Sequence, residues 1–279
     1  MTRIESESAE FQLLEALLHN RRKREQRDEF LIEGVRAIDR ALSGGWPVRA
    51  ALVSADAERS SWATDVLARV PEHIELRPDL FARLTARQDP PEVVLVGRIP
   101  PPDLAAVPRP ADGVVVVVDR PSSPGNLGTI LRTADAMGAA GVLTTGHGVH
   151  LYDPQTVRAS VGSLFALPVV PVASNQELAD WVAVWRSEAP ITVYATDEDG
   201  ELVLRADTHV GRPAVLLLGS ERSGLARALR DLADVTIAIP MCGSTSSLNV
   251  AVAHGIVLHH LMGSTPRDYG DGPWLTTPP

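Results

Sequence analysis

The chain has 279 residues, of which 44% are hydrophobic and 22% are charged, a composition typical of a globular protein and not of a disordered one. The single cysteine, Cys242, excludes an intramolecular disulfide and a cysteine-rich zinc site. No segment is long and apolar enough to span a membrane, and the polar N-terminus lacks the apolar core of a secretory signal. We therefore expect a cytoplasmic protein of one large domain or two smaller ones.

The basic residues exclude several enzyme classes. Lys23 is the only lysine among 26 Lys and Arg, and it lies within Arg-Arg-Lys-Arg. The chain therefore has neither a G-x-x-x-x-G-K-[ST] phosphate-binding loop nor a Schiff-base lysine in its main body. The G-x-S-x-G and H-E-x-x-H motifs of common hydrolases and metalloproteases are also absent. The net charge of −9 argues weakly against a nucleic acid partner, but clustered basic groups can outweigh a negative total.

The first 98 residues follow an alternating α/β pattern. Apolar residues recur at helix-like spacing between residues 10 and 45, on either side of a polar stretch, and predict helix until Gly44. β-Branched runs predict strands over residues 48–54 and 93–97, with a helix over residues 60–70 between them.

A proline-dense segment divides the chain. Five prolines lie within residues 99–110, so we expect a stiff linker over 99–112 between domains at 1–98 and 113–262. Five consecutive valines, 114–118, predict a strand covered on both faces and hence a parallel sheet. We expect a flexible tail over residues 263–279. Further strands are predicted near residues 142–143, 169–172, 191–194, 215–218 and 235–239, and a final helix over 247–261.

Three blocks in the second domain carry candidate functional residues. In the first, a strand ends at Asp119 and we expect a helix to begin near Gly128, with Arg132 in about its first turn. An arginine there opposes the helix macrodipole, and such a local conflict indicates function. Asn126, in the preceding loop, has the alternative interpretation of an ordinary helix cap.

The other two blocks also place polar residues after buried strands. In residues 215–225 glycines bracket a polar loop, so backbone groups can approach a ligand, and Glu221 is either a helix-start residue or a ligand contact. In residues 237–253 a strand and a Gly/Ser loop precede an apolar helix, which we expect to be capped near residues 246–247 and to contain Asn249. A buried amide needs a specific partner, with a purely structural asparagine as the alternative.

In this order and spacing the three blocks resemble the motifs of the SpoU (TrmH-like) branch of the SPOUT RNA methyltransferases, over about residues 113–262. The pattern Asn-x-Gly-x-x-x-Arg lies at 126–132 and Gly-x-Glu-x-x-Gly-Leu at 219–225. Ile-Pro-Met-x-Gly lies at 239–243, followed by Ser-Leu-Asn-Val at 247–250. No motif position departs from the family pattern.

This resemblance implies a trefoil-knotted α/β methyltransferase domain with a parallel sheet, which dimerises and binds S-adenosylmethionine without a metal. It implies methyl transfer to a ribose 2′-hydroxyl of RNA, with Arg132 either accepting the proton or fixing the hydroxyl and a phosphate. Asn126 and Ser247 would position substrate groups, and Glu221 and Asn249 would hold the motif loops together. The implied cofactor contacts are Leu218, Gly219, Ile239, Met241, Gly243 and Leu248.

The first domain resembles the L30-like α/β substrate-binding domain that precedes many of these enzymes, on the segment Phe-Leu-Ile-Glu-Gly-Val-Arg-Ala-Ile at 30–38. It carries a basic cluster opposed only by Glu25, which suits RNA phosphates, with a solvated helix face as the alternative. Ribosomal RNA is favoured as the partner, and transfer RNA is the alternative. The cluster consists of Arg21, Arg22, Lys23, Arg24 and Arg27.

Two other functions compete with this one. A non-catalytic RNA-binding protein could use the same fold, but intact Asn126, Arg132 and Asn249 argue against it. A nucleotide-dependent oxidoreductase is disfavoured because no G-x-G-x-x-G fingerprint follows a predicted strand.

Overall fold

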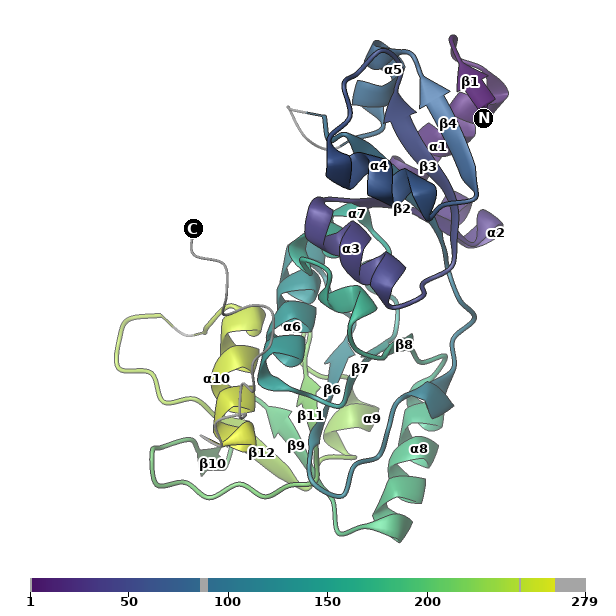
Figure 1. Ribbon diagram of the computed structural model, residues 1–279. Helices are drawn as coiled ribbons and strands as arrows, with labels where there is room; N and C mark the ends of the chain where they lie inside the picture. The colour runs from purple at the N-terminus through teal and green to yellow at the C-terminus, as the bar shows by residue number, and fades with distance from the viewer. Residues whose placement is uncertain (1, 86–89, 246, 264–279) are drawn as a thin grey trace.

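The computed structural model describes residues 2–85, 90–245 and 247–263, which form two α/β units, each built around its own sheet (Figure 1). The chain passes from the N-terminal unit to the C-terminal unit through residues 99–113. Within the described residues, no helix is long and apolar enough to cross a membrane.

The N-terminal unit contains a mixed five-stranded sheet in the order β1-β4-β3-β5-β2. β5 pairs antiparallel with β2 and β3, whereas β4 pairs parallel with β1 and β3. The strands are β1 (Thr2–Ile4), β2 (Glu29–Glu33), β3 (Val48–Ser54), β4 (Glu72–Leu76) and β5 (Val93–Arg98). The helices are α1 (Ala9–His19), α2 (Arg21–Arg27), α3 (Val35–Ser43), α4 (Ser61–Ala68) and α5 (Pro78–Arg83).

The helix expected over residues 10–45 is wrong at its centre, because β2 interrupts it. Phe30 and Ile32 pack on one face of the sheet and Leu31 on the other, so the strand presents consecutive apolar residues. Periodicity cannot distinguish such a run from a buried helix. The sequence patterns also do not predict β1, β4 or α5. In β4, only Ile74 and Leu76 are buried, among charged and polar neighbours.

The C-terminal unit contains seven parallel strands in the order β10-β12-β9-β11-β6-β7-β8, which confirms the predicted parallel sheet. The strands are β6 (Val114–Asp119), β7 (Gly141–Thr145), β8 (Val169–Pro171), β9 (Thr192–Thr196), β10 (Leu202–Val203), β11 (Ala214–Leu218) and β12 (Val235–Ala238). The helices are α6 (Pro124–Met137), α7 (Pro154–Ala159), α8 (Asn175–Glu188), α9 (Arg227–Arg230) and α10 (Val250–Met262), with 3₁₀ turns η1 (Leu104–Ala106) and η2 (Ser163–Phe165).

Helices cover both faces of this sheet: α6 and α10 lie on one side, and α8 and α9 on the other (Figure 1). Alternate valines of β6 (114, 116 and 118) join the core under α6 and α10, and the other two (115 and 117) join Trp181 and Trp185 of α8. The five valines are at most 2% exposed. The prediction of a strand covered on both faces is confirmed, because successive side chains of a strand point to opposite faces.

Two helices begin elsewhere than expected. α6 starts at Pro124 behind the cap Ser123, not near Gly128, so Arg132 lies in its third turn. The macrodipole argument for Arg132 is therefore wrong, since that effect is confined to the first turn. α10 starts at Val250, with Asn249 as an exposed N-cap and not as a buried interior residue. Its side chain satisfies a free amide of the first turn, which is what a helix start requires.

The proline-dense segment and the tail complete the chain. The segment between β5 and β6 contains η1, and its Val107 is buried against the C-terminal sheet, so it is not a free extended spacer. Of the tail expected over residues 263–279, only Gly263 lies within the described residues.

The two units share one apolar core. Phe30 and Trp46 of the N-terminal unit pack against Tyr152 and Phe165 of the C-terminal unit, with ring centroids 4.7 Å apart for Phe30–Tyr152 and 5.1 Å apart for Trp46–Phe165. Gly162, at φ 92°, lets the backbones approach, because a Cβ there would lie 2.9 Å from the carbonyl oxygen of Arg36. Packing therefore fixes the orientation of one unit on the other.

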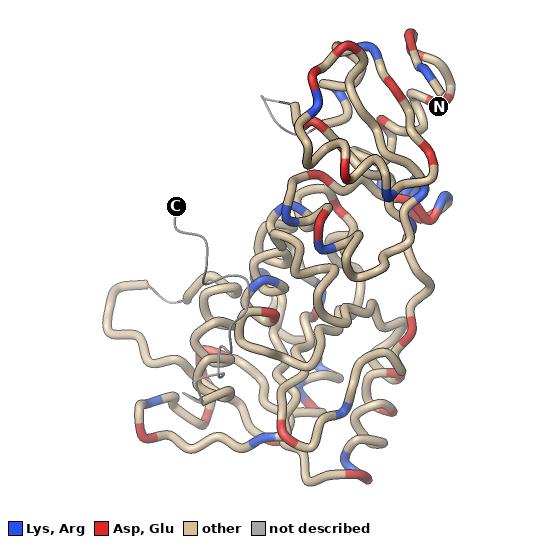
Figure 2. Tube along the Cα trace, in the orientation of Figure 1, with Lys and Arg blue, Asp and Glu red and all other residues tan. Residues whose placement is uncertain are grey.

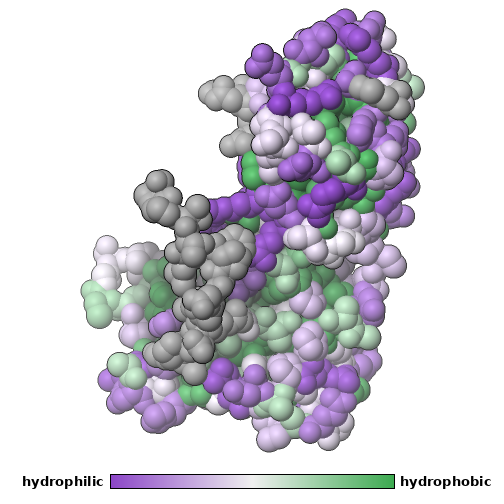
Figure 3. Space-filling model, viewed as in Figure 1, coloured by the Kyte–Doolittle hydropathy of each residue, from purple (hydrophilic) through white to green (hydrophobic). Residues whose placement is uncertain are grey.

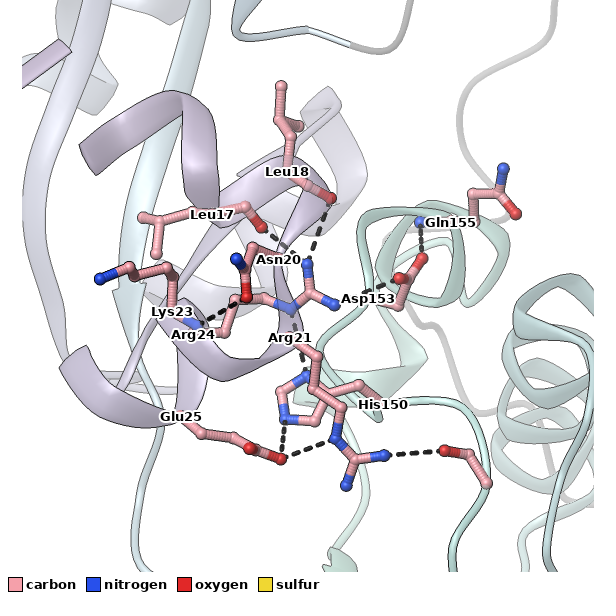
Figure 4. Close-up of polar contacts among 11 residues, drawn as sticks. Leu17, Leu18, Asn20, Arg21, Lys23, Arg24, Glu25, His150, Asp153 and Gln155 are labelled. Atoms are coloured by element: carbon pink, nitrogen blue, oxygen red, sulfur yellow. Dashed lines mark hydrogen bonds and ion pairs between the residues drawn. The ribbon is translucent and has the colours of Figure 1, made fainter. Parts of the chain in front are cut away.

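A buried polar network around Arg24 of α2 crosses the same interface (Figure 4). Its guanidinium is 3% exposed and donates to the carbonyl oxygens of Leu17 at 2.8 Å and Leu18 at 3.2 Å. Across the interface it donates to Nδ1 of His150 at 3.2 Å and to Asp153 at 3.3 Å. Burial, and then the charge of Arg24, lowers the pKa of His150 to about 4, so the ring is neutral at pH 7 and can accept this bond.

Replacing Arg24 with alanine leaves the Asp153 carboxylate without its buried partner and the Leu17 and Leu18 carbonyls without this donor. We expect the free energy of unfolding in urea to fall by about 2–4 kcal/mol. Arg22→Ala, on the exposed side of the same helix, is the matched control and should change it by less than about 0.5 kcal/mol. Equal effects of the two substitutions would contradict this role of Arg24.

His254 of α10 makes the stability of the fold depend on pH. Its ring is fully buried, and neither nitrogen hydrogen-bonds to another described residue. Burial lowers its pKa from 6.5 to about 4. As the pH falls below 6.5, the unfolded chain takes up a proton that the folded chain does not, so stability is lost until the pH reaches about 4.

In the variant His254→Leu, we expect the stability lost between pH 7 and pH 5 to be smaller than in the wild type by about 2 kcal/mol. Urea unfolding at both pH values measures this difference. His259→Leu, an exposed position of the same helix, should leave the pH dependence as it is in the wild type. An unaltered pH dependence in His254→Leu would show that His254 is not the titrating group.

Candidate functional site

Three loops leave the sheet of the C-terminal unit at its carboxyl edge. They follow β6, β11 and β12, and their described residues are 120–123, 219–226, 239–245 and 247–249. β6 and β11 are paired neighbours, whereas β12 lies beyond β9. Parallel strands deliver their loops to one edge, and open parallel sheets bind ligands there.

A chain of side-chain hydrogen bonds joins the three loops. Glu221 accepts from the Ser122 hydroxyl at 2.5 Å and from the Asn126 amide nitrogen at 2.7 Å. The Asn126 carbonyl oxygen accepts from the Asn249 amide at 3.0 Å. Asn249 in turn accepts from the backbone amide of Ala251 at 2.9 Å, which caps α10. Each loop thus contributes a member of one network.

The charge of Glu221 orients this network. Partial burial alone would raise its pKa, but the hydrogen bonds from Ser122 and Asn126 outweigh burial and hold the pKa below its ordinary value. An ionised carboxylate can only accept hydrogen bonds, so the Asn126 side chain must turn its amide nitrogen toward Glu221. The carbonyl oxygen of Asn126 then points toward Asn249. Asn126, which was expected to contact substrate, therefore has both atoms of its amide group engaged within the protein.

The sequence patterns did not single out a second support for these loops, at the end of β6. The Asp119 carboxylate is 1% exposed and accepts from the Thr145 hydroxyl at 3.0 Å and from the Ala226 backbone amide at 2.7 Å. Arg120 pairs with it at 3.0 Å and donates to the carbonyl oxygen of Gly224 at 2.9 Å. The sequence does contain a signal for this support, because an acidic residue directly follows five valines at the end of the predicted buried strand. A carboxylate in such a place is buried and therefore requires hydrogen-bond partners.

The loop after β11 is tight because Gly219 has no side chain. Ser220 and Gly224 exchange backbone hydrogen bonds of 3.1 and 2.9 Å across it. A Cβ at Gly219 would lie 2.6 Å from the Gly224 carbonyl carbon and from the Leu225 nitrogen. Any other residue at position 219 would have to open the loop.

The residues expected to hold a cofactor lie on the same edge. Leu218 is fully buried at the end of β11, and Ile239 is half-buried after β12. Met241 and Leu248 are apolar yet 36% and 38% exposed, and a Cβ on Gly243 would meet no atom within 4 Å. Exposed apolar side chains beside open backbone fit a ligand with an aromatic ring and polar edges.

Arg132 and Ser247 are exposed and stand outside the network. Arg132 follows Asn126 by six residues on α6, about 9 Å along the helix axis. Neither its guanidinium nor the Ser247 hydroxyl has a hydrogen bond or ion pair with another described residue. Both side chains are therefore free to bind a ligand.

The basic cluster of α2 is divided between the interior and the surface, in a part of the molecule where basic and acidic positions alternate (Figure 2). Arg24 is buried between the units, so we leave it out of any RNA-binding surface. Arg21 pairs with Glu25 at 2.7 Å and Arg27 with the buried Glu29 at 3.0 Å. Arg22 is exposed and Lys23 partly exposed.

In the described part of the chain, no group of three or more His, Cys, Asp or Glu side chains is placed to hold a metal ion.

Comparisons with known proteins match both units. The family described as SpoU rRNA Methylase matches residues 113–259, and the SpoU L30e-like domain matches residues 8–95. The chain is 45% identical, over 99% of its length and 96% of the relative, to the 23S rRNA (uridine(2479)-2′-O)-methyltransferase of Streptomyces viridochromogenes. The crystal structure of the SpoU methyltransferase AviRb from that organism, in complex with AdoMet, superposes with a TM-score of 0.86 at 45% identity, covering 91% of this chain and 97% of that one. An rRNA methyltransferase of Sinorhizobium meliloti gives 0.80 at 29% identity, with 93% and 96% covered.

Because both family descriptions match in chain order and relatives are covered almost from end to end, this chain belongs to the SpoU rRNA methylase family, with an L30e-like domain ahead of its methylase domain.

Proposed function

We propose that this protein transfers a methyl group from S-adenosylmethionine to a ribose 2′-hydroxyl of ribosomal RNA. The observation that carries the proposal is the hydrogen-bonded chain through Glu221, Asn126 and Asn249, which joins the three SpoU motif loops while Arg132 stays exposed. The Streptomyces viridochromogenes relative is a 23S rRNA 2′-O-methyltransferase, and the AviRb structure contains AdoMet.

The proposed reaction divides the work between cofactor and protein. When bound, S-adenosylmethionine supplies an electrophilic methyl group on a positively charged sulfur. The ribose 2′-oxygen forms a bond to the methyl carbon while the sulfur–carbon bond breaks, and the hydroxyl proton must leave. Arg132 holds the hydroxyl and a neighbouring phosphate with its planar fork of donors, and the hydroxyl proton passes to an oxygen of that phosphate. In the alternative, Arg132 takes the proton itself, which requires its guanidinium to have lost a proton beforehand, because a charged guanidinium has donors only.

The other site residues hold the loops in place and orient the substrate. Glu221, Asn126 and Asn249 keep the loops in register, and the exposed Ser247 hydroxyl positions the substrate. Backbone groups near Gly219 and Gly243 contact the polar parts of the cofactor. The remaining proposed cofactor contacts are the side chains of Leu218, Ile239, Met241 and Leu248.

We also propose that Arg21, Arg22, Lys23 and Arg27 of the L30e-like domain contact RNA phosphates, which suits their position on α2. The family resemblance supports a knotted C-terminal segment. We also propose a cytoplasmic location, which a ribosomal RNA substrate supports.

Methyl transfer with radiolabelled S-adenosylmethionine tests the function directly. Purified protein is incubated with ribosomal RNA or with transfer RNA, and 2′-O-methyl positions in the products are then mapped. We expect label at a 2′-O-methyl position of large-subunit ribosomal RNA. Label in transfer RNA alone would favour the alternative substrate, and label in neither would overturn the proposal.

Arg132→Ala should lower kcat for methyl transfer by about 10²–10³-fold, because it removes a group placed at the reacting atoms. Its affinity for S-adenosylmethionine, measured by calorimetry, should change less than twofold. Arg205→Ala, another exposed arginine of the same domain, serves as the control and should keep wild-type turnover. Near-normal turnover in Arg132→Ala would rule out this role.

Glu221→Gln tests the loop network. A glutamine brings amide hydrogens against the donors of Ser122 or Asn126, so we expect the loops to separate and the affinity for S-adenosylmethionine to fall at least tenfold. Calorimetric titration measures this, with Glu198→Gln, an exposed position in the same domain, as control. Wild-type affinity in Glu221→Gln would mean that the cofactor site does not depend on the network.

Exposed apolar side chains gather on the last loop and on α10. Val252 and Ile256 lie one turn apart and are 52% and 40% exposed, and Met241 and Leu248 precede them. An apolar stripe open to solvent marks an interaction face. We propose that the protein forms a homodimer through this face, as the family resemblance implies.

In the double variant Val252→Glu/Ile256→Glu, two charges occupy the proposed interface, so a dimer should become a monomer. Sedimentation velocity at micromolar concentration measures this. Val203→Glu places a charge on an exposed valine of β10 and should leave the dimer intact. A wild-type monomer would refute the proposed interface.

A further inference from the structure

A fourth loop at the carboxyl edge of the methylase sheet lies between the motif loops and the L30e-like domain. It follows β7 and spans residues 146–153, and we call it the β7 loop. Because β7 pairs parallel with β6, this loop emerges beside the motif loop at 120–123. None of its residues belongs to the three motifs.

The β7 loop is packed directly on the loop after β6. The backbone amide of Val149 donates to the carbonyl oxygen of Pro121 at 2.7 Å. A Cβ on Gly148 would lie 2.6 Å from that same oxygen, and a Cβ on Gly146, at φ 67°, would lie 2.6 Å from Cγ of Arg120. The two glycines thus let the backbones approach, and the single residue between them is held beside the motif loop.

Helix α2 of the L30e-like domain contacts the β7 loop from the other side (Figure 4). Arg21 donates to the carbonyl oxygen of Gly148 at 2.9 Å, and Arg24 donates to Nδ1 of His150 at 3.2 Å. In the view of Figure 3, hydrophilic residues cover much of the L30e-like domain and reach its junction with the methylase domain. A chain of contacts therefore leads from the helix that carries the proposed phosphate contacts, through the β7 loop, to the motif loops.

His147, the residue between the two glycines, presents an aromatic ring at this place. It is exposed, and its imidazole has no hydrogen bond or ion pair with another described residue. Every Phe, Tyr and Trp within the described ranges is buried or half-buried, so none of those rings is fully open to a ligand. Imidazole is one of the planar groups on which proteins stack unpaired RNA bases.

We propose that His147 stacks on an unpaired base of the RNA substrate, between the phosphates held at α2 and the ribose held by Arg132. A base within a duplex is covered on both faces by its neighbours, so the ring selects a strand that is single-stranded or bulged at this point. Stacking tolerates any base, because every base has a flat aromatic face. The inference rests on the proposed function in that RNA is the partner.

Binding of two short RNA probes to the full-length protein tests the proposal. One probe is fluorescein-labelled decaadenylate, and the other has the same ribose-phosphate backbone without bases. Fluorescence anisotropy gives each Kd. We expect His147→Ala to weaken decaadenylate binding about tenfold, in the lower part of the range for a stacked base, and to leave binding of the abasic probe unchanged. An equal loss on both probes, or no loss on decaadenylate, would overturn the proposal.

Two further variants separate stacking from a contact between the imidazole and a phosphate. His147→Phe keeps an aromatic ring without charge and should bind decaadenylate within about twofold of the wild type. His147→Lys keeps a cation without a ring and should bind as weakly as His147→Ala. The reverse order of these two affinities would assign a phosphate contact and refute stacking. His209→Ala, at an exposed histidine of the same domain, is the matched control and should bind as the wild type does.

Methyl transfer to ribosomal RNA separates this proposal from the proposed function. In His147→Ala we expect KM for ribosomal RNA to rise about tenfold, while kcat and the affinity for S-adenosylmethionine stay within about twofold of the wild type. A loss of cofactor affinity would show that His147 supports the motif loops instead, which would overturn the stacking role. A wild-type protein that transfers no methyl group would contradict the proposed function, and the two oligonucleotide probes would still decide whether His147 stacks on RNA.

Discussion

The carboxylate of Glu221 is the constraint on which the site depends. A parallel sheet brings the loops after β6, β11 and β12 to one edge, but it does not set the distances between them. The bonds from Ser122 and Asn126 to Glu221, continued to Asn249, set those distances and also cap the last helix. Asp119 and Arg120, at the end of β6, also hold the loop after β11, through hydrogen bonds with the backbone of Ala226 and Gly224. The positions of the three loops thus follow from the hydrogen bonds that the carboxylates of Glu221 and Asp119 require.

The polar residues of the site fall into two groups, those hydrogen-bonded within the protein and those exposed without a side-chain partner among the described residues. Asn126 and Asn249 hydrogen-bond to each other, to Glu221 and to the first turn of α10, so their side-chain amides are engaged within the protein. Arg132 and Ser247 are exposed and have no side-chain partner among the described residues. A group already satisfied within the protein has little to offer a ligand, whereas an exposed, unpaired one gains from binding it.

The domain interface follows the same logic at a larger scale. The aromatic core around Phe30 and Tyr152 stabilises the interface by removing apolar surface from water, an effect that does not depend on direction. The Arg24 network is directional, because the guanidinium must meet two carbonyls of its own domain and His150 and Asp153 of the other. Together they hold the L30e-like domain in one orientation relative to the loops at the edge of the methylase sheet.

Much of this protein can be predicted from its sequence. The five valines of β6 predict a parallel sheet covered on both faces, since no half-exposed strand keeps five apolar residues in a row. The three motifs, by residue type and spacing, identify the family, and they contain most of the residues that the structure brings to one edge of the sheet. A local sequence pattern is sufficient to predict structure or family where the residues of one short segment specify it by themselves, as in β6 and the three motifs.

Only the tertiary structure decided the rest, because the deciding contacts join residues far apart in the chain. β2 lies within a stretch whose apolar residues recur at helix-like spacing, and its pairing with β5, more than sixty residues later, makes it a strand. Arg24 looks like its exposed neighbours in sequence, but His150 and Asp153 make it an interior residue. Asn249 was expected inside a helix, yet its bond to Asn126 and its cap on Ala251 place it at the helix start. A sequence specifies each side chain's chemistry, whereas its burial and its partner depend on what the folded chain places beside it.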